Sequence, residues 1–406
     1  MFLVVLMMTP LPKIPLMGLA GAVFGISTIK IRKGKEEDAE KAAAAKAKPE
    51  REERPEKLIL PDPMEVEVGY GLIRLVDRKQ GGDLLDRITN MRRQMAQELG
   101  IVVPPVRIRD NIQLQPNQYH VKIRGGKVAE GEVLPGHLLA IDSGMVVDKV
   151  AGTPTTEPAF GLPALWIAQD QRQPAERNNY TVVEASSVLS THLTETIKRH
   201  ADELVTRHEV NRLLDNLKER SPKLVEELVP TVIKPGEIQK ALQYLLRERV
   251  PIRDLETILE TLGDWASRTK DPDVLVEYVR TALARTICDQ YRAESGTLAC
   301  ITFDPKIEES IGAHLEVSEH GTLWAMPPNL QTKIVQAVKS EVDRVLPSLE
   351  GRAAVILCAP RVRLWVRRML EASLPHVAVL SYNEIVRGVQ VESRGMVVLN
   401  DESEDV

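Results

Sequence analysis

A run of charged residues and alanines from Lys35 to Lys57 sets the strongest limit on how this chain can fold. It holds no aliphatic or aromatic side chain larger than alanine, so it cannot bury a hydrophobic core. Pro49 and Pro55 stop any helix that its alanines favour. We therefore predict a charged linker over residues 32–65, which separates an apolar N-terminus from a folded remainder.

The N-terminus carries two apolar stretches, Met1–Met8 and Ile14–Ile29. Basic residues follow the second stretch, beginning at Lys30, whereas a signal peptide carries its positive charge first. We predict membrane segments within residues 1–31 and a cytoplasmic location for the rest of the chain. The alternative is an apolar hairpin buried against a domain. Because the sequence opens inside an apolar stretch, we also expect further membrane helices upstream of it.

Length and composition narrow the class of protein. A chain of 406 residues predicts two to four domains. A net charge of -5 gives no general attraction to nucleic acid, and 4% aromatic residues predict mostly aliphatic cores. Cys288, Cys300 and Cys358 form no C-x-x-C pair, so we expect buried, reduced thiols rather than disulfides or a zinc site.

Periodicity predicts both helices and strands in the first half of the folded part. A helix is expected after Asp83, because apolar residues recur there at helical spacing up to Gly100. Tyr119, Val121 and Ile123 alternate with polar residues, which predicts a half-buried strand. Short apolar runs separated by Gly and Pro predict a small sheet-containing domain over residues 136–184.

The second half is predicted to be a helical bundle followed by a small α/β domain. Asp254 and the pair Asp271-Pro272 mark helix starts within the bundle. From Leu298 onward, apolar runs alternate with helical stripes. The predicted fold class is α+β multidomain: an N-terminal membrane segment, a charged linker, two small α/β subdomains, a helical subdomain and a C-terminal α/β subdomain.

No motif in the sequence indicates a reaction centre. Gly125-Gly126-Lys127 lacks the spacing of a P-loop, and Gly69-Tyr70-Gly71 lacks the third glycine of a dinucleotide-binding fingerprint. Ser143 has no G-x-S-x-G elbow around it. We therefore predict no catalytic residue and no cofactor, and we expect that the protein is not an enzyme.

Histidines and arginines are the remaining candidates for chemistry. His192, His200 and His208 are eight residues apart, which disfavours a shared metal ion and favours solvated or half-buried helix positions. The densest basic cluster, around Arg363, predicts a solvated helix face or a protein contact rather than a nucleic-acid surface. We predict no metal site and no nucleic-acid partner.

Several stretches, taken together, resemble one family in that family's own order. They are Gly69–Asp77, Pro105–Asn111, Glu157–Leu162, Thr181–Ala185 with Thr191–Leu193, and Val250–Leu262. These are similar to the G-Y-x-L-I-x-L-V-D, P-x-x-x-I-R-D-N, P-A-F-G-L, T-V-V-E/D with T-H-L, and V-P-I-R-D…I-L-E-T-L motifs of the flagellar and type III secretion export gate family. The versions here look flagellar rather than virulence-type, although a virulence-type gate stays open as an alternative.

The resemblance implies a membrane half that uses the proton motive force and a cytoplasmic half of four subdomains. Subdomain 1 would cover 66–135 and 185–204, subdomain 2 would cover 136–184, helical subdomain 3 would cover 205–284 and α/β subdomain 4 would cover 285–400. It also implies a nonameric ring at the bacterial inner membrane. That ring would bind flagellar export chaperones with their substrates, other export-gate and export-ATPase components, and, through the N-terminal segment, the lipid bilayer. Rival hypotheses are an uncharacterised multidomain enzyme and a membrane-tethered structural protein.

The same resemblance assigns a chaperone-binding site between the first two subdomains. Matched by motif, Phe160 is expected at the floor of a hydrophobic dimple and Glu157 at its acidic rim. Val183 and Thr191 match two further wall positions. A large apolar ring at a Pro- and Gly-flanked site is a natural anchor for a partner segment. Without the resemblance, Phe160 and Val183 favour ordinary core positions.

Overall fold

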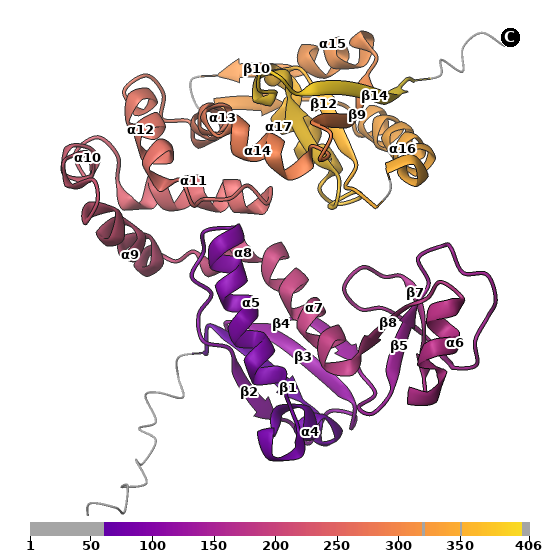
Figure 1. The fold of residues 1–406 in the computed structure, drawn as a ribbon. Coiled ribbons are helices and arrows are strands. Elements are labelled where there is room, and N and C mark those ends of the chain that lie inside the picture. The colour runs from indigo at the N-terminus through magenta and orange to yellow at the C-terminus, as the bar shows by residue number, and fades with distance from the viewer. Residues whose placement is uncertain (1–60, 319–320, 350, 400–406) are drawn as a thin grey trace, which may run out of the picture. The chain divides into compact units, whose positions relative to one another are not determined.

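The structure is a computed structural model that describes residues 61–318, 321–349 and 351–399 (Figure 1). The predicted membrane segments within residues 1–31, and nearly all of the predicted linker, lie outside these ranges. Within them, no helix combines the length and the apolar character that a bilayer crossing needs. The described fold is mixed α/β, as the sequence predicted, and it contains three four-stranded sheets and a two-stranded hairpin.

The first sheet is built from strands far apart in the chain. Its strands are β1 (Met64–Val68), β2 (Arg107–Asp110), β3 (Gln118–Ile123) and β4 (Gly126–Glu132), in the order β2-β1-β3-β4. Tyr119, Val121 and Ile123 are buried while their neighbours are not, so the predicted half-buried strand is confirmed. The helices of this region are α4 (Ile73–Val76), α5 (Leu84–Glu98) and α7 (Ala185–Arg199).

The second sheet is antiparallel throughout. Its strands are β5 (Leu138–Ile141), β6 (Thr153–Thr156), β7 (Pro163–Ile167) and β8 (Thr181–Glu184), in the order β6-β7-β5-β8. One face, with Leu139 and Trp166, joins the large core of the first sheet. The other face, with Leu138 and Ile167, forms a small core of its own near α6 (Arg172–Arg177). The sheet is therefore apolar on both faces, which explains its short continuous apolar runs.

The middle of the chain is helical, as predicted. Its helices are α8 (Ala201–Leu204), α9 (Arg207–Lys218), α10 (Pro222–Leu228), α11 (Pro235–Arg247), α12 (Leu255–Ala266), α13 (Pro272–Ala282) and α14 (Ala284–Tyr291). The carboxylate of Asp254 accepts the backbone N–H of Thr257, and that of Asp271 accepts the N–H of Asp273. Both predicted helix starts are thus real N-caps.

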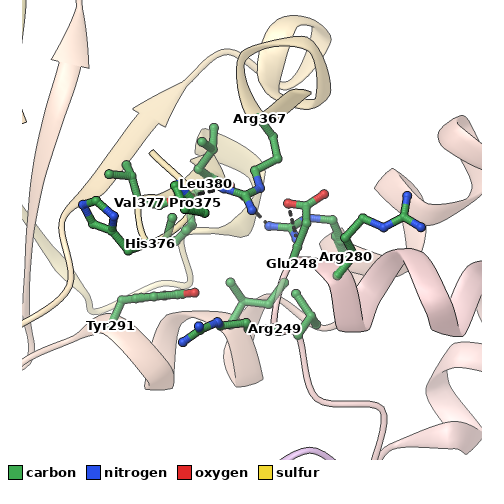
Figure 2. Close-up of a pocket in the computed structure, with 14 residues that line it drawn as sticks. Glu248, Arg249, Arg280, Tyr291, Arg367, Pro375, His376, Val377 and Leu380 are labelled. Carbon is green, nitrogen blue, oxygen red and sulfur yellow. Dashed lines mark hydrogen bonds and ion pairs between the residues drawn. The ribbon is translucent and has the colours of Figure 1, made fainter. Parts of the chain in front are cut away.

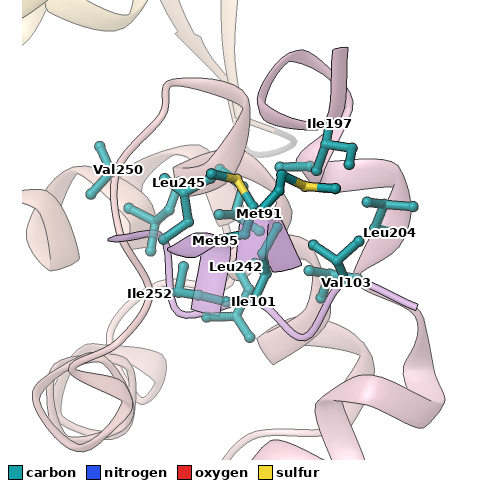
Figure 3. Packing of buried hydrophobic residues seen from close by; sticks show 14 of the residues in the cluster. Met91, Met95, Ile101, Val103, Ile197, Leu204, Leu242, Leu245, Val250 and Ile252 are labelled. Carbon is teal, nitrogen blue, oxygen red and sulfur yellow. The ribbon is translucent and has the colours of Figure 1, made fainter. Parts of the chain in front are cut away.

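One hydrophobic core joins the first sheet to the helical region. Figure 3 shows Met91 and Met95 of α5 packed among Ile101, Leu242 and Leu245. The backbone N–H of Ile252 also donates to the carbonyl of Leu99 at 2.8 Å. Because these side chains share one buried core, separating the two regions would expose them to water.

The third sheet is parallel. Its strands are β9 (Thr297–Phe303), β12 (Val355–Cys358), β13 (Ala378–Ser381) and β14 (Gln390–Val397), in the order β13-β12-β9-β14. Around it lie the hairpin β10 (Leu315–Ser318) and β11 (Gly321–Trp324) and helices α15 (Pro305–Ala313), α16 (Pro328–Val345) and α17 (Pro360–Leu370). All four residues of β12 are buried, as expected for a parallel strand covered on both faces. The three cysteines are buried too, as predicted.

Five short 3-10 helices complete the described elements. They are η1 (Tyr70–Leu72), η2 (Arg78–Gln80), η3 (Gln169–Gln171), η4 (Leu346–Leu349) and η5 (Tyr382–Glu384).

Arg363 corrects one expectation from the sequence. The basic cluster of α17 was predicted to form a solvated helix face or a protein contact, but Arg363 within it is fully buried. Its guanidinium donates to Glu277 of α13 at 2.7 Å and to Glu248, the residue that follows α11, at 2.6 Å. Arg280 pairs with Glu248 at 3.1 Å and with Glu384 at 2.6 Å. The prediction was wrong because charge pattern alone does not reveal carboxylates on other helices that make such burial tolerable.

Candidate functional site

The site begins with a tight turn between β6 and β7. The backbone N–H of Glu157 donates to the carbonyl of Leu162 at 2.8 Å, and that of Gly161 donates to the carbonyl of Glu157 at 2.9 Å. Gly161 has a φ of +74° with no atom within 4 Å of where a Cβ would lie. Only its left-handed backbone therefore demands glycine there. The result is a closed loop of six residues that ends where β7 begins.

Phe160 lies on this turn and points away from the core. It is 62% exposed, while its neighbour Ala159 is buried. An exposed aromatic ring on a constrained turn suits contact with a partner better than internal packing. The alternative that Phe160 is a core residue, which the sequence alone favoured, is wrong.

Glu157 does not lie at a rim. Its residue is 3% exposed, because its carboxylate turns inward and binds the turn itself. One oxygen accepts the N–H of Ala159 at 2.9 Å and the other accepts the N–H of Phe160 at 2.7 Å. The expectation of an acidic rim is therefore corrected: a carboxylate that has two backbone donors within reach is better satisfied inside the loop than at its surface.

Val183 and Thr191 occupy different settings. Val183 is on β8 opposite Leu139 of β5, half-buried, and packs against the large core. Thr191 is exposed on α7. In the part of the chain that the structure describes, no hydrogen bond or ring contact joins Phe160, Val183 and Thr191 to one another.

Tyr119 and His192 form a buried pair that joins β3 to α7, the helix that carries Thr191. The hydroxyl of Tyr119 on β3 lies 2.7 Å from Nδ1 of His192 on α7, directly after Thr191. Burial, together with the nearby Glu157 carboxylate, raises the pKa of Tyr119. Burial lowers the pKa of His192 to about 4, helped by the positive charge of Arg199. At neutral pH the histidine is therefore uncharged, and one of its ring nitrogens bonds the tyrosine hydroxyl.

Sequence reasoning missed this buried pair. The alternation of β3 indicated that Tyr119 faces inward, but no local signal paired it with a histidine 73 residues away. Gly131 is the one related signal in the sequence: a Cβ there would lie 2.5 Å from the Tyr119 hydroxyl, so the buried tyrosine leaves room only for glycine. The expectation of a solvated or half-buried His192 is corrected to a buried one.

A small hollow lies beside β13, the strand at one edge of the third sheet (Figure 2). Its cavity volume is about 30 Å³, which is room for one or two water molecules. Two arginines donate to backbone carbonyls at this edge strand. Arg367 donates to Val377, just before β13, at 3.1 Å, and Arg280 donates to Val379 of β13 at 3.4 Å. The hollow is thus part of the packing against β13 and too small for a cofactor.

Among residues 61–318, 321–349 and 351–399, no group of three or more His, Cys, Asp or Glu side chains could hold a metal ion. Two of the three histidines spaced eight residues apart have other partners: His192 bonds Tyr119, and His200 pairs with Glu203 at 2.8 Å.

Comparison with known proteins places the chain in a family. A family model described as the FHIPEP family matches residues 1–390. The chain belongs to the FHIPEP family. Among curated proteins similar to this FHIPEP chain is the flagellar biosynthesis protein FlhA of Bacillus subtilis (strain 168), which is 48% identical over 336 residues. That alignment covers 83% of this chain and 49% of the relative.

Other relatives agree. The flagellar biosynthesis protein FlhA of Escherichia coli (strain K12) is 39% identical over 326 residues, or 80% of this chain and 46% of that protein. The FHIPEP chain thus spans about half the length of the curated relatives it matches.

Solved structures share the fold. A structure of the Chlamydia pneumoniae CdsV and CdsO protein complex matches with a TM-score of 0.75 and 26% identity, covering 84% of this chain and 98% of that one. The cryo-EM structure of nonameric EPEC SctV-C matches with a TM-score of 0.68 and 22% identity, covering 83% and 98%. The second likeness shows the fold alone.

Proposed function

We propose that this chain is a component of the flagellar type III protein-export gate, and that its cytoplasmic region forms a ring that docks chaperone–substrate complexes for export across the bacterial inner membrane. Its family membership and its 48% identity to a flagellar biosynthesis protein support the flagellar assignment. Its relatives are named for flagellar biosynthesis rather than for a reaction. A virulence-type gate is the closest alternative.

The observation that carries the docking role is the exposed Phe160 on its constrained turn. A ring that is 62% exposed offers a partner a large apolar contact. Because the turn is already fixed by four hydrogen bonds, little conformational entropy is lost on binding. A groove or helix of a chaperone that covers Phe160 would gain most of its affinity there.

Ring formation and further partners rest on the comparisons. A similar fold has been solved as a nonamer, and another as a complex of CdsV with CdsO. We propose by analogy that this chain assembles with itself into a nonameric ring and binds components of the export apparatus. The four-subdomain division, with the bounds given above, and attachment to the bilayer through residues 1–31 belong to the same proposal.

Calorimetry with a purified flagellar export chaperone bound to its substrate tests this proposal. The full chain should bind the complex, and Phe160→Ala should weaken binding. The rival hypothesis, an enzyme with a site divided between domains, gives no reason for such binding. A chain that binds no export chaperone in any substrate-bound form would remove the docking role.

A further inference from the structure

From the geometry of the turn we infer that Glu157 is a positioning residue: it acts on the partner only through Phe160, by holding the turn in the shape that presents the ring. This inference rests on the proposed docking function. It reverses the role that an acidic residue beside an apolar anchor suggests, which is a direct electrostatic contact with the partner.

The Glu157 side chain is out of reach of a partner. Glu157 is 3% exposed, whereas Phe160, three residues later, is 62% exposed. A partner that covers the ring therefore meets very little of the Glu157 side chain. Any charged contact with the partner would require the carboxylate to leave its buried position.

Both carboxylate oxygens of Glu157 already accept hydrogen bonds. Each accepts one backbone N–H, from Ala159 at 2.9 Å and from Phe160 at 2.7 Å. Hydrogen bonds to a carboxylate are stronger than those between neutral groups. The amide that carries the aromatic ring is thus bonded directly to Glu157, and rotating Glu157 outward would leave the buried N–H of Ala159 and the part-buried N–H of Phe160 without their partner.

Buried residues lie next to the turn. Ala159 is buried, and the Glu157 carboxylate lies close enough to Tyr119 to raise the pKa of its hydroxyl. Tyr119 bonds His192, which follows Thr191 on α7. Glu157 thus holds the presented ring through its own turn and lies near the buried pair that connects β3 to α7.

A double-mutant cycle with Phe160 tests the inference. Calorimetry would use the full chain, its variants and a purified flagellar export chaperone bound to its substrate. Glu157→Ala should lower affinity about tenfold, because the partner must then order the turn as it binds. In a chain that already carries Phe160→Ala, Glu157→Ala should cost nothing further, since it acts only through the missing ring. Glu157→Asp, which keeps a carboxylate near the same N–H groups, should restore most of the affinity.

Hydrogen exchange supplies a readout that is independent of binding. The amides of Ala159 and Phe160 should exchange at least about tenfold faster in Glu157→Ala than in the parent chain, with little change elsewhere. Glu157→Asp should keep them protected. Unchanged exchange at these two amides would overturn the inference, whatever the binding data show.

The two proposals fail differently. If Phe160→Ala leaves chaperone binding unchanged, the docking function fails, while the exchange data still decide whether Glu157 holds the turn. If Glu157→Ala weakens binding as strongly without Phe160 as with it, Glu157 contacts the partner directly and the positioning role is wrong.

Discussion

At the scale of single residues, the exposure of Phe160 separates binding from stability. Phe160→Ala should lower chaperone affinity by about 30-fold, equivalent to about 2 kcal/mol, the usual cost of losing an aromatic anchor. The melting temperature should fall only slightly, because a ring that is 62% exposed contributes little to the core. Calorimetry and thermal unfolding of the same samples check both expectations.

The matched control for this change is Tyr70→Ala. Tyr70 is an aromatic residue of similar exposure, 68%, outside the turn. It should leave chaperone binding unaltered. If both variants weaken binding equally, general surface apolarity rather than Phe160 is responsible.

His192 should make stability depend on pH. Its pKa of about 4 lies below the usual value near 6.5 for an unfolded chain. The unfolded state then binds the proton more readily, so stability should decrease as pH falls from about 6.5 to about 4. The full difference is about 3 kcal/mol, from about 1.4 kcal/mol per pH unit.

His192→Asn checks this dependence. Asparagine can still accept from the Tyr119 hydroxyl but does not titrate. Urea unfolding at several pH values should show a smaller loss of stability in the variant between pH 6.5 and 4 than in the parent. Parallel curves for the two proteins would contradict a depressed histidine pKa.

The sequence predicted the site residues unevenly, for physical reasons. Phe160 was found because a family motif marks it, yet its exposure depends on a turn whose hydrogen bonds are not visible in the sequence. Glu157 was placed at an acidic rim by the same motif, and only the two N–H groups beside it explain its burial. Tyr119 and His192 are 73 residues apart, so their contact depends on the tertiary fold.

At the scale of elements, the buried ion pairs of α17 connect it to α11 and α13. Arg363→Met should destabilise the protein by about 3–5 kcal/mol, because it leaves the half-buried carboxylates of Glu248 and Glu277 without their fully buried partner. Although burial acts to raise the pKa of Glu248, the charges of Arg363 and Arg280 hold it at about 2. Denaturant unfolding measures the loss.

A neighbouring arginine provides the control for that variant. Arg368 is on the same helix and pairs with Asp273 at 2.7 Å, but its side chain is 38% exposed. Arg368→Met should therefore cost less than about 1 kcal/mol. Similar losses for both variants would show that burial of the Arg363 ion pairs is not what stabilises the contact of α17 with α11 and α13.

Local chemistry predicted the helices and strands better than their pairing. The helix after Asp83 was predicted from its apolar spacing and is α5, although the Asp83 side chain pairs with Arg87 instead of capping the backbone. β14 was missed, because its exposed residues carry no apolar pattern. Its parallel partner β9 lies almost 100 residues earlier in the chain, so only the tertiary fold decides that pairing.

At the scale of the whole molecule, the described unit should fold without the N-terminal segments. Contacts group Asp62–Val406 as one unit, and residues 1–57 contain the predicted membrane segments and most of the linker. A chain that begins at Leu58 should unfold cooperatively and be monomeric at low concentration, because it keeps all three cores. Circular dichroism and analytical ultracentrifugation check this; an aggregated or molten chain would mean that the boundary is wrong.

The chain has two junctions rich in Pro and Gly that could act as hinges, at residues 131–136 and at Lys234–Gly236, and movement within that unit should be concentrated at one of them. At Lys234–Gly236, α11 begins and its next buried residues, Ile238 and Leu242, enter the core shared with the first sheet, so rotation there would separate packed side chains. At residues 131–136 the chain enters the second sheet, of which one face joins the large core and the other has a small core of its own, and Gly136 has a φ of +86°. Because contacts between domains of one chain are often mobile, we expect small-angle scattering of the Leu58 chain to require more than one conformer.

Spin labels placed on β6 and α9 should report a distribution of distances, while labels on α5 and α11 should report a single one. One conformer that fits the scattering across temperature and salt would contradict this expectation, and a broad distribution between α5 and α11 would move the hinge to Lys234–Gly236.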